Sequence, residues 1–434
     1  MKEILIGSIV IVVIALAVLP TGAFTEEYSL DDLYGIALQR SEKIKVSEEN
    51  LYIAKLGKEK AFSVLVPKVS AFGNYTKYSE DKSTGFGVIQ PDFATVWGMK
   101  LEQSFSLSGR ELTGLKMAEE NIVRNSYDLY AAREEHLFAV ASAYYDVLKA
   151  KKILDIADSN LERLTKHRNA AEKRLKVGEV TRTALLRAEG ELSGARSDQL
   201  TVKNGWELAR AILARIVVIN RDFQLREAPR EDMQISSLTS LQEIALAERA
   251  EIKSLESQKK IAGQQIQYAK GTYWPELSVS GVYKGADQSP ASPFLLKESA
   301  YGELSLDFPL FEGGLRRAEV REAKAKERQA GLFYEDLKKT IQIEVESAYL
   351  ELVTQKGILK FLEDQLVFAR DNYYAVSKQF EFGLADSIDV MDANTLLVSA
   401  ERKVAEAVYN YQLSILRIKR VTGVLLKTVV SHKF

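Results

Sequence analysis

The stretch LYGIALQRSEKIKVSEENLYIAKLGKEKAFSVLVPKVSAFGNY, residues 33–75, is repeated in a divergent form as LQEIALAERAEIKSLESQKKIAGQQIQYAKGTYWPELSVSGVY at residues 241–283. The alignment needs no gap, and Leu33, Ala37, Ile44, Ala54 and Pro67 fall on Leu241, Ala245, Ile252, Ala262 and Pro275. Further along, ASAYYDVLKAKKIL (141–154) matches ESAYLELVTQKGIL (346–359). A self-match of this length indicates an internal duplication.

Two repeats account for nearly the whole chain. We place the first repeat at residues 24–220 and the second at 237–426. An inter-repeat equatorial segment at 221–236 joins them, and a tail at 427–434 follows. Each repeat has the same pattern: a helix, a proline, a strand, a polar loop, a strand, a very long helix, a glycine turn and a helix.

Prolines and glycines mark the changes between helix and strand. Pro67 and Pro275 each end a helix and favour extended chain before them. The pair Gly313 and Gly314 is expected to turn a strand into a helix at a place where a Cβ atom would clash. We interpret these four residues as architecture.

The strands are predicted from the alternation of apolar and polar residues. One face carries Trp97, Met99, Leu101, Phe105 and Leu107, and in the second repeat Leu304, Leu306, Phe308 and Leu310. Strands of about ten residues with one apolar face suit a transmembrane barrel, although a half-buried sheet in a soluble domain gives the same pattern. Four strands per chain cannot close a barrel, which needs at least about eight, whereas three chains would supply about twelve strands. The loops are expected at about 79–94 and 285–299.

Two proline-free stretches, residues 110–177 and 315–382, predict helices of roughly 100 Å at about 1.5 Å per residue. Each carries a seven-residue repeat of apolar residues, which is typical of left-handed coiled coils. In the first helix, the seven-residue pattern comprises Val140, Val147, Leu154, Leu161 and Leu175, with Arg168 as the one exception. In the second helix, it comprises Val345, Leu352, Leu359, Leu366, Tyr373 and Phe380. A further stripe on the second helix comprises Phe361, Phe368, Ala375 and Phe382. A helix that is apolar on two sides packs between two neighbours, which favours a tube of helices over a rod.

Composition excludes several function classes. Basic and acidic residues are balanced at 59 and 60, so no nucleic-acid binding is expected. The chain has no cysteine, which excludes disulfides, zinc–thiolate sites and an acylated N-terminal cysteine. The three histidines, His136, His167 and His432, lie far apart in the sequence. Since no nucleophile–base–acid set is evident either, we expect no metal, no cofactor and no enzymatic activity.

The first residues predict export from the cytoplasm. Lys2 precedes an apolar run from Ile4 to Leu19, which is shorter than the about 20 residues of a membrane span. Residues 1–23 are therefore interpreted as a signal peptide cleaved near Ala23, with an uncleaved inner-membrane anchor as the alternative. Since no later segment resembles a transmembrane helix, membrane insertion of the mature chain requires strands.

Two motifs resemble those of the TolC-like outer-membrane factor family. They are FPLFEGG at residues 308–314 and GLADSIDVMDA at 383–393, and with the duplication the resemblance covers residues 29 to about 426. It implies a homotrimer whose β-barrel of about twelve strands lies in the lipid of the outer membrane. A long α-helical barrel would continue it into the periplasm.

The same resemblance implies a passive conduit for efflux or type I secretion. Such a channel docks a periplasmic adaptor (a membrane fusion protein) and an inner-membrane pump. A non-channel periplasmic coiled-coil adaptor or scaffold is the alternative, because its helical hairpins would have the same heptads. The sequence identifies neither the pump class nor the exported substrate.

The resemblance places adaptor docking at the two turns that follow the long helices. The docking residues would be Val177, Gly178, Glu179, Phe382, Gly383 and Leu384. A glycine lets a helix end in a left-handed turn, and an apolar residue at an exposed tip needs a partner. An ordinary helical hairpin is the alternative. Because Glu179 replaces an apolar residue of the family, docking at the first turn is expected to differ.

An acidic set follows the second turn. Asp389 and Asp392 match the positions of the family's acidic pore constriction, and Asp386 lies beside them. Asp389 and Asp392 are three residues apart and share a helix face, so a trimer would form carboxylate rings that favour cations. Alternatively, Asp386 is the N-cap of a helix and Asp389 completes a capping-box-like pair. Capping explains Asp392 less well.

The polar lock of the best-described family member cannot form in this sequence. The resemblance places the arginine, tyrosine and aspartate of that lock at Ala385, Phe380 and Ala184. We therefore expect either gating by a different mechanism or weak closure of the tip. Glu179, Arg182 and Asp386 are the residues expected to supply a closing contact.

Overall fold

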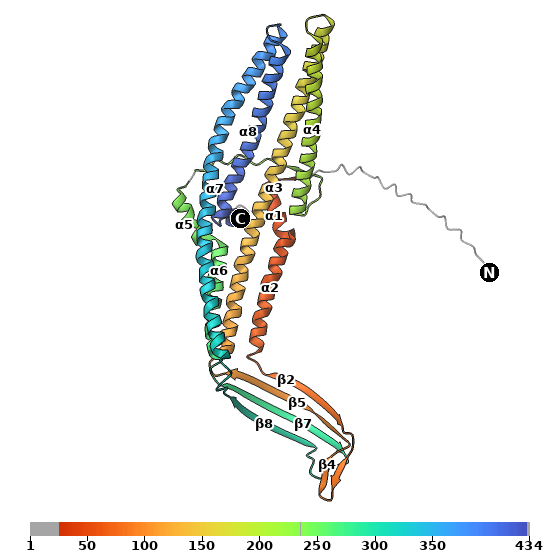
Figure 1. The fold of residues 1–434 in the computed structure, drawn as a ribbon, viewed down its shortest axis with the longest axis vertical. Coiled ribbons are helices and arrows are strands. Elements are labelled where there is room, and N and C mark those ends of the chain that lie inside the picture. The colour runs from red at the N-terminus through yellow and green to blue at the C-terminus, as the bar shows by residue number, and fades with distance from the viewer. Residues whose placement is uncertain (1–25, 235, 432–434) are drawn as a thin grey trace, which may run out of the picture.

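The computed structural model describes residues 26–234 and 236–431. The molecule is elongated, with helices along most of its length and a β-sheet at one end (Figure 1). The predicted signal peptide at residues 1–23 lies outside the described part of the chain. Among the helices that are described, none is long and apolar enough to cross a membrane.

Both repeats have the same order of long elements. The first contains α1 (Leu30–Arg40), α2 (Glu42–Ser63), β2 (Lys68–Lys77), β5 (Phe93–Ser106), α3 (Arg110–Lys176) and α4 (Arg182–Val217). The second contains α5 (Leu238–Glu248), α6 (Ala250–Gly271), β7 (Glu276–Ser289), β8 (Glu298–Asp307), α7 (Leu315–Glu381) and α8 (Ser387–Val421), followed by α9 (Leu425–Ser431). The helices α3 and α7 have 67 residues each, and their limits agree with the prediction to within one residue.

The four long strands form one antiparallel sheet in the order β2-β5-β7-β8. Strands β5 and β7 come from different repeats and pair from Phe93↔Ser289 to Ser106↔Glu276. The two repeats therefore meet in the middle of the sheet (Figure 1). The outer strands β2 and β8 each lack a strand partner on one side in the described chain.

The predicted apolar face of the sheet is largely uncovered. Met99 pairs with Tyr283 of the neighbouring strand, and 59% of Met99 is exposed. Leu304 and Leu306 of β8 are exposed as well, at 70% and 61%. Soluble monomeric proteins rarely expose apolar surface of this extent.

The helix predicted before each proline is wrong in one respect, because the structure divides it in two. The first helix breaks at Ser41, whose ψ of 125° turns the backbone out of the helical region, and the second breaks at Arg249, with ψ 127°. The Arg249 side chain is buried and binds Glu251 and Glu344. The backbone of Gly423, at the end of α8, lies against this break, where an added Cβ would be 3.0 Å from the Arg249 Cα. Tertiary contacts therefore accompany this break, and apolar periodicity does not reveal it.

Short strands were also missed by the sequence prediction. The loop predicted at 79–94 contains a hairpin of β3 (Lys82–Thr84) and β4 (Gly87–Gln90). The loop predicted at 285–299 is shorter than expected, because β7 continues to Ser289. Strand β1 (Glu26–Tyr28) pairs in parallel with β6 (Phe223–Leu225), which attaches the start of the first repeat to the inter-repeat segment. These strands depend on pairing partners that alternation alone does not specify.

The helices form two hairpins, α3–α4 and α7–α8, which contact each other through α3 and α8. The main buried clusters lie near the middle of the molecule, around α1, α5 and α9. Val140, Val147 and Val345 of the predicted heptads are buried there. Nearer the helix tips, Leu161 and Leu366 are half-buried. The hairpins are therefore anchored in the middle and project from it.

Candidate functional site at the helical tip

Two turns end the long helices at the tip of the molecule. In the first tip turn (residues 177–181), Gly178 has φ 80°, and the Glu179 N–H donates to the Arg174 carbonyl at 2.9 Å. In the second (residues 382–386), Gly383 has φ 76°, and the Leu384 N–H donates to the Gln379 carbonyl at 2.8 Å. This is the Schellman arrangement, in which a left-handed residue lets the chain satisfy the last carbonyls of a helix.

The six residues considered for adaptor docking all lie in or beside these turns and are exposed. Val177, Phe382 and Leu384 are at least 70% exposed, so each turn presents apolar side chains to its surroundings. Glu179 is exposed too and approaches Arg174, with 3.9 Å between the carboxylate oxygen and Nε. The first turn is therefore partly charged, whereas the second is apolar at its apex.

The acidic residues divide into a capping pair and a separate carboxylate. Asp386 is the N-cap of α8, and its Oδ1 accepts from the N–H groups of Ile388 and Asp389 at 2.7 and 3.0 Å. The Asp389 carboxylate accepts in return from the Asp386 N–H at 3.0 Å. The capping-box alternative is thus present in the structure. Asp392 is exposed and has no hydrogen bond or ion pair with another residue of the described chain.

The two hairpins contact each other close to the turns, on the side that faces the middle of the molecule. The Arg174 guanidinium of α3 donates to the carbonyls of Phe380 and Glu381 in α7 at 2.8 and 3.0 Å. It also lies over the Phe380 ring, with 4.3 Å between Cζ and the ring centroid. His167 of α3 packs against the same ring and is 2.8 Å from the Ser387 Oγ of α8.

The closing contact expected from Glu179, Arg182 and Asp386 is therefore made differently within the chain. Glu179 is near Arg174, Asp386 caps its own helix, and Arg182 has no partner among the described residues. Next to the turns, Arg174 and His167 of α3 contact the second hairpin.

A cleft of ≈ 680 Å³ separates the two tip turns. Its walls include Arg187 and Thr181 of the first hairpin and Leu384, Ile388 and Asp389 of the second. The cleft combines apolar and charged groups and contains no cluster of potential metal ligands, since no such cluster exists among the described residues. Both hairpins therefore contribute polar and apolar side chains to this cleft.

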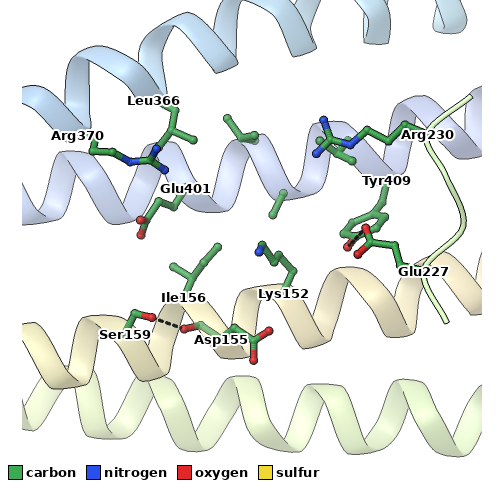
Figure 2. Close-up of a pocket in the computed structure, with 13 residues that line it drawn as sticks. Lys152, Asp155, Ile156, Ser159, Glu227, Arg230, Leu366, Arg370, Glu401 and Tyr409 are labelled. Atoms are coloured by element: carbon green, nitrogen blue, oxygen red, sulfur yellow. Dashed lines mark hydrogen bonds between the residues drawn. The ribbon is translucent and has the colours of Figure 1, made fainter. Parts of the chain in front are cut away.

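A second pocket, of ≈ 360 Å³, lies between the hairpins nearer the middle of the molecule (Figure 2). Glu227 of the inter-repeat segment accepts from the Tyr409 hydroxyl at 3.0 Å, and Arg230 approaches Glu363 at 3.5 Å. Glu401 binds Arg163 at 3.1 Å, so several charges at this pocket already have partners. These contacts fasten the inter-repeat segment and α3 to the second hairpin.

The four linker residues lie at the junctions of sheet and helices. Pro67 and Pro275 directly precede β2 and β7, and Gly314 is the N-cap of α7. The clash predicted for a Cβ at Gly313 and Gly314 is wrong, because an added Cβ would meet nothing within 4 Å. Glycine is needed there for the backbone, since φ is 62° and 91°.

Comparison with known proteins places the chain in a family. The sequence profile described as "Outer membrane efflux protein" matches residues 33–217 and 241–424. The chain belongs to this family. This family member is 23% identical to the outer membrane protein TolC of Escherichia coli over 84% of the chain and 76% of TolC. It is 22% identical to the alkaline protease secretion protein AprF of Pseudomonas aeruginosa over 67% of the chain and 62% of AprF.

Solved structures agree on the fold. The Campylobacter jejuni CmeC outer membrane channel matches with a TM-score of 0.81 and 17% identity, over 91% of this chain and 86% of CmeC. The resemblance to TolC-like outer-membrane factors is confirmed. As a member of the outer membrane efflux protein family, the chain is an outer-membrane protein, and its family is one of channels rather than enzymes.

Sequence reasoning did not single out Arg174, His167 and Ser387, which make the contacts between the hairpins. A basic residue in the last turn of a helix, such as Arg174, is usually explained by the helix dipole of its own helix. The hydrogen bond from Arg174 to the Phe380 carbonyl joins residues 206 positions apart, so no local sequence pattern predicts it.

Proposed function

We propose that three copies of this chain form a passive conduit from the periplasm to the exterior. The observation that carries the proposal is the sheet, because its two outer strands each lack a partner on one side in the described chain and its apolar face is uncovered. Unpaired backbone groups at a strand edge are not tolerated in lipid. Pairing β8 of one chain with β2 of the next closes a barrel of about twelve strands and removes every edge.

The two faces of the sheet support this orientation. The cross-strand neighbours Met99 and Tyr283 belong to the apolar face, which would contact lipid. The opposite face carries Lys100 and Glu102, which form an ion pair, and would line the lumen. A barrel with this alternation has an apolar outside and a wet inside.

The exposed stripe on α7 supports a helical barrel that continues the β-barrel along the length of the helices. Phe361 and Phe368 are each 73% exposed, and Phe382 continues the stripe to the tip. In a trimer these side chains would pack against the neighbouring chain, which buries apolar surface on both sides of α7. Each chain would then contribute two equivalent helical hairpins to the wall of the barrel, one from the repeat 24–220 and one from the repeat 237–426. The equatorial segment 221–236 would join them, with the tail 427–434 beside them.

The tip would be the docking surface for a periplasmic adaptor and, through it, an inner-membrane pump. The exposed apolar side chains of Val177, Phe382 and Leu384 support this placement. The relatives include proteins named for efflux and for protease secretion, so the inner-membrane partner would be an efflux pump or a protein-secretion pump. Asp392, together with Asp386 and Asp389 at the start of α8, would form the acidic constriction of the pore.

The test is to purify the full chain from outer-membrane fractions and to record it in planar lipid bilayers. We expect a detergent-stable trimer that forms cation-selective channels, and Asp392→Asn should reduce the selectivity. Lys356→Gln changes a charge far from the tip and serves as the control. A soluble monomer without channel activity would overturn the proposal in favour of a coiled-coil adaptor or scaffold.

A further inference from the structure

Phe380 is nearly buried although it lies one turn from the exposed tip. Only 7% of it is exposed, compared with 77% of Phe382 two residues later. The groups that cover it include two from the other hairpin, Arg174 at 4.3 Å and His167 at 5.1 Å between ring centroids. The end of α7 is therefore held by residues of α3.

Arg174 binds the end of α7 in three ways. Its two terminal nitrogens donate to the carbonyls of Phe380 and Glu381, and its guanidinium plane covers the Phe380 ring. A positive charge at this place also interacts favourably with the negative end of the α7 dipole. The Arg174 side chain is 22% exposed, so water screens these interactions less than at an open surface. A lysine cannot reproduce the planar, two-pronged geometry.

His167 strengthens the same contact without competing with it. Burial and the nearby Arg174 lower the pKa of His167 below its ordinary value. The ring is therefore neutral at neutral pH and does not repel the guanidinium. It joins the Ser387 hydroxyl at 2.8 Å, so α3 is connected to the start of α8 as well as to the end of α7.

Few other side-chain bonds join the hairpins near the tip. The next ones along α3 are made by Arg163, which binds Asn394 and Glu401, and by Asn160, which binds Asn394. Moving the second tip turn away from the first must therefore break the Arg174 contact. The same movement carries the acidic residues at the start of α8 with it.

We propose that Arg174 is the gate-holding residue of this channel, which latches the tip of the second hairpin, and its acidic residues, to the first hairpin. The inference rests on the proposed channel function. Opening the pore then requires Arg174 to leave the α7 carbonyls and the Phe380 ring. An adaptor that docks at the tip cleft is placed to separate these groups.

The experiment is single-channel recording of the purified trimer in planar bilayers with Arg174→Gln, Arg174→Lys and Arg182→Gln. Arg182→Gln is the matched control, because it removes the same charge at the same tip from a residue with no partner in the described chain. We expect Arg174→Gln to raise the open fraction about tenfold, equivalent to about 1.4 kcal/mol, with Arg174→Lys close to it and Arg182→Gln unchanged.

Phe380→Leu tests the latch from the other hairpin and keeps an apolar side chain. It should raise the open fraction less than Arg174→Gln does, and the double variant should match Arg174→Gln because both changes act on one contact. Trimers of equal heat resistance show that folding is intact. If Arg174→Gln behaves like Arg182→Gln, the latch is refuted while the channel stands. If the unmodified chain forms no channels, the proposed function fails first.

Discussion

At the scale of single residues, Glu134 is a buried carboxylate with no basic residue bound to it in the described chain. It is 4% exposed in α3 and accepts from the Leu426 N–H at 3.2 Å, and burial raises its pKa to about 7. Between the ordinary pKa and pH 7 the unfolded chain loses this proton while the folded chain keeps it. Stability therefore falls as pH rises through this window and stays lower above pH 7.

Glu134→Gln removes this penalty and keeps an acceptor for the Leu426 N–H. We expect little change in stability near pH 4.5 and a gain that grows to about 3 kcal/mol, at most, by pH 8. Thermal unfolding of the trimer in detergent at both pH values measures it. Glu162→Gln, on an exposed face of the same helix, is the control and should show no such growth. A gain that is equal at both pH values would contradict the ionisation argument.

At the scale of elements, the break between α5 and α6 depends on one buried cation. The Arg249 side chain is 4% exposed and binds Glu251 and Glu344, while Arg420 approaches the same two carboxylates. Arg249→Met leaves these carboxylates short of a partner. We expect a loss of about 2 kcal/mol, below the about 3–5 kcal/mol of a fully buried pair, because both glutamates are partly exposed and Arg420 compensates in part.

Thermal unfolding of the trimer checks this prediction, with Lys326→Ala as the control. Lys326 forms an exposed ion pair with Glu322 on α7, and its loss should change stability by less than about 0.5 kcal/mol. Equal effects of the two substitutions would show that the helix break does not need Arg249.

The sequence predicted elements well where their cause is local or repeated. The limits of α3 and α7 follow from proline-free heptads, and the Asp386–Asp389 capping box follows from spacing within four residues. The break at Arg249 was not predicted, because the helical pattern resumes at the next residue and Glu344, which binds the Arg249 side chain, lies 95 positions away. The Arg174 contact escaped for the same reason. Contacts between repeats depend on how the helices are placed, which periodicity does not encode.

At the scale of the whole molecule, the exposed stripe on α7 should decide whether chains assemble. Phe361→Ser with Phe368→Ser removes apolar surface that the single chain leaves uncovered, so the fold of each chain should survive while trimers become weaker. Loss of the heat-resistant trimer on gels, with helical circular dichroism retained, is the expected result. Phe86→Ser with Phe294→Ser is the matched control, because these side chains are at least as exposed but lie in the loops beyond the sheet. Trimers that persist in the α7 variant would mean that the strands alone hold the assembly together, and the helices would then be free to move apart at the tip.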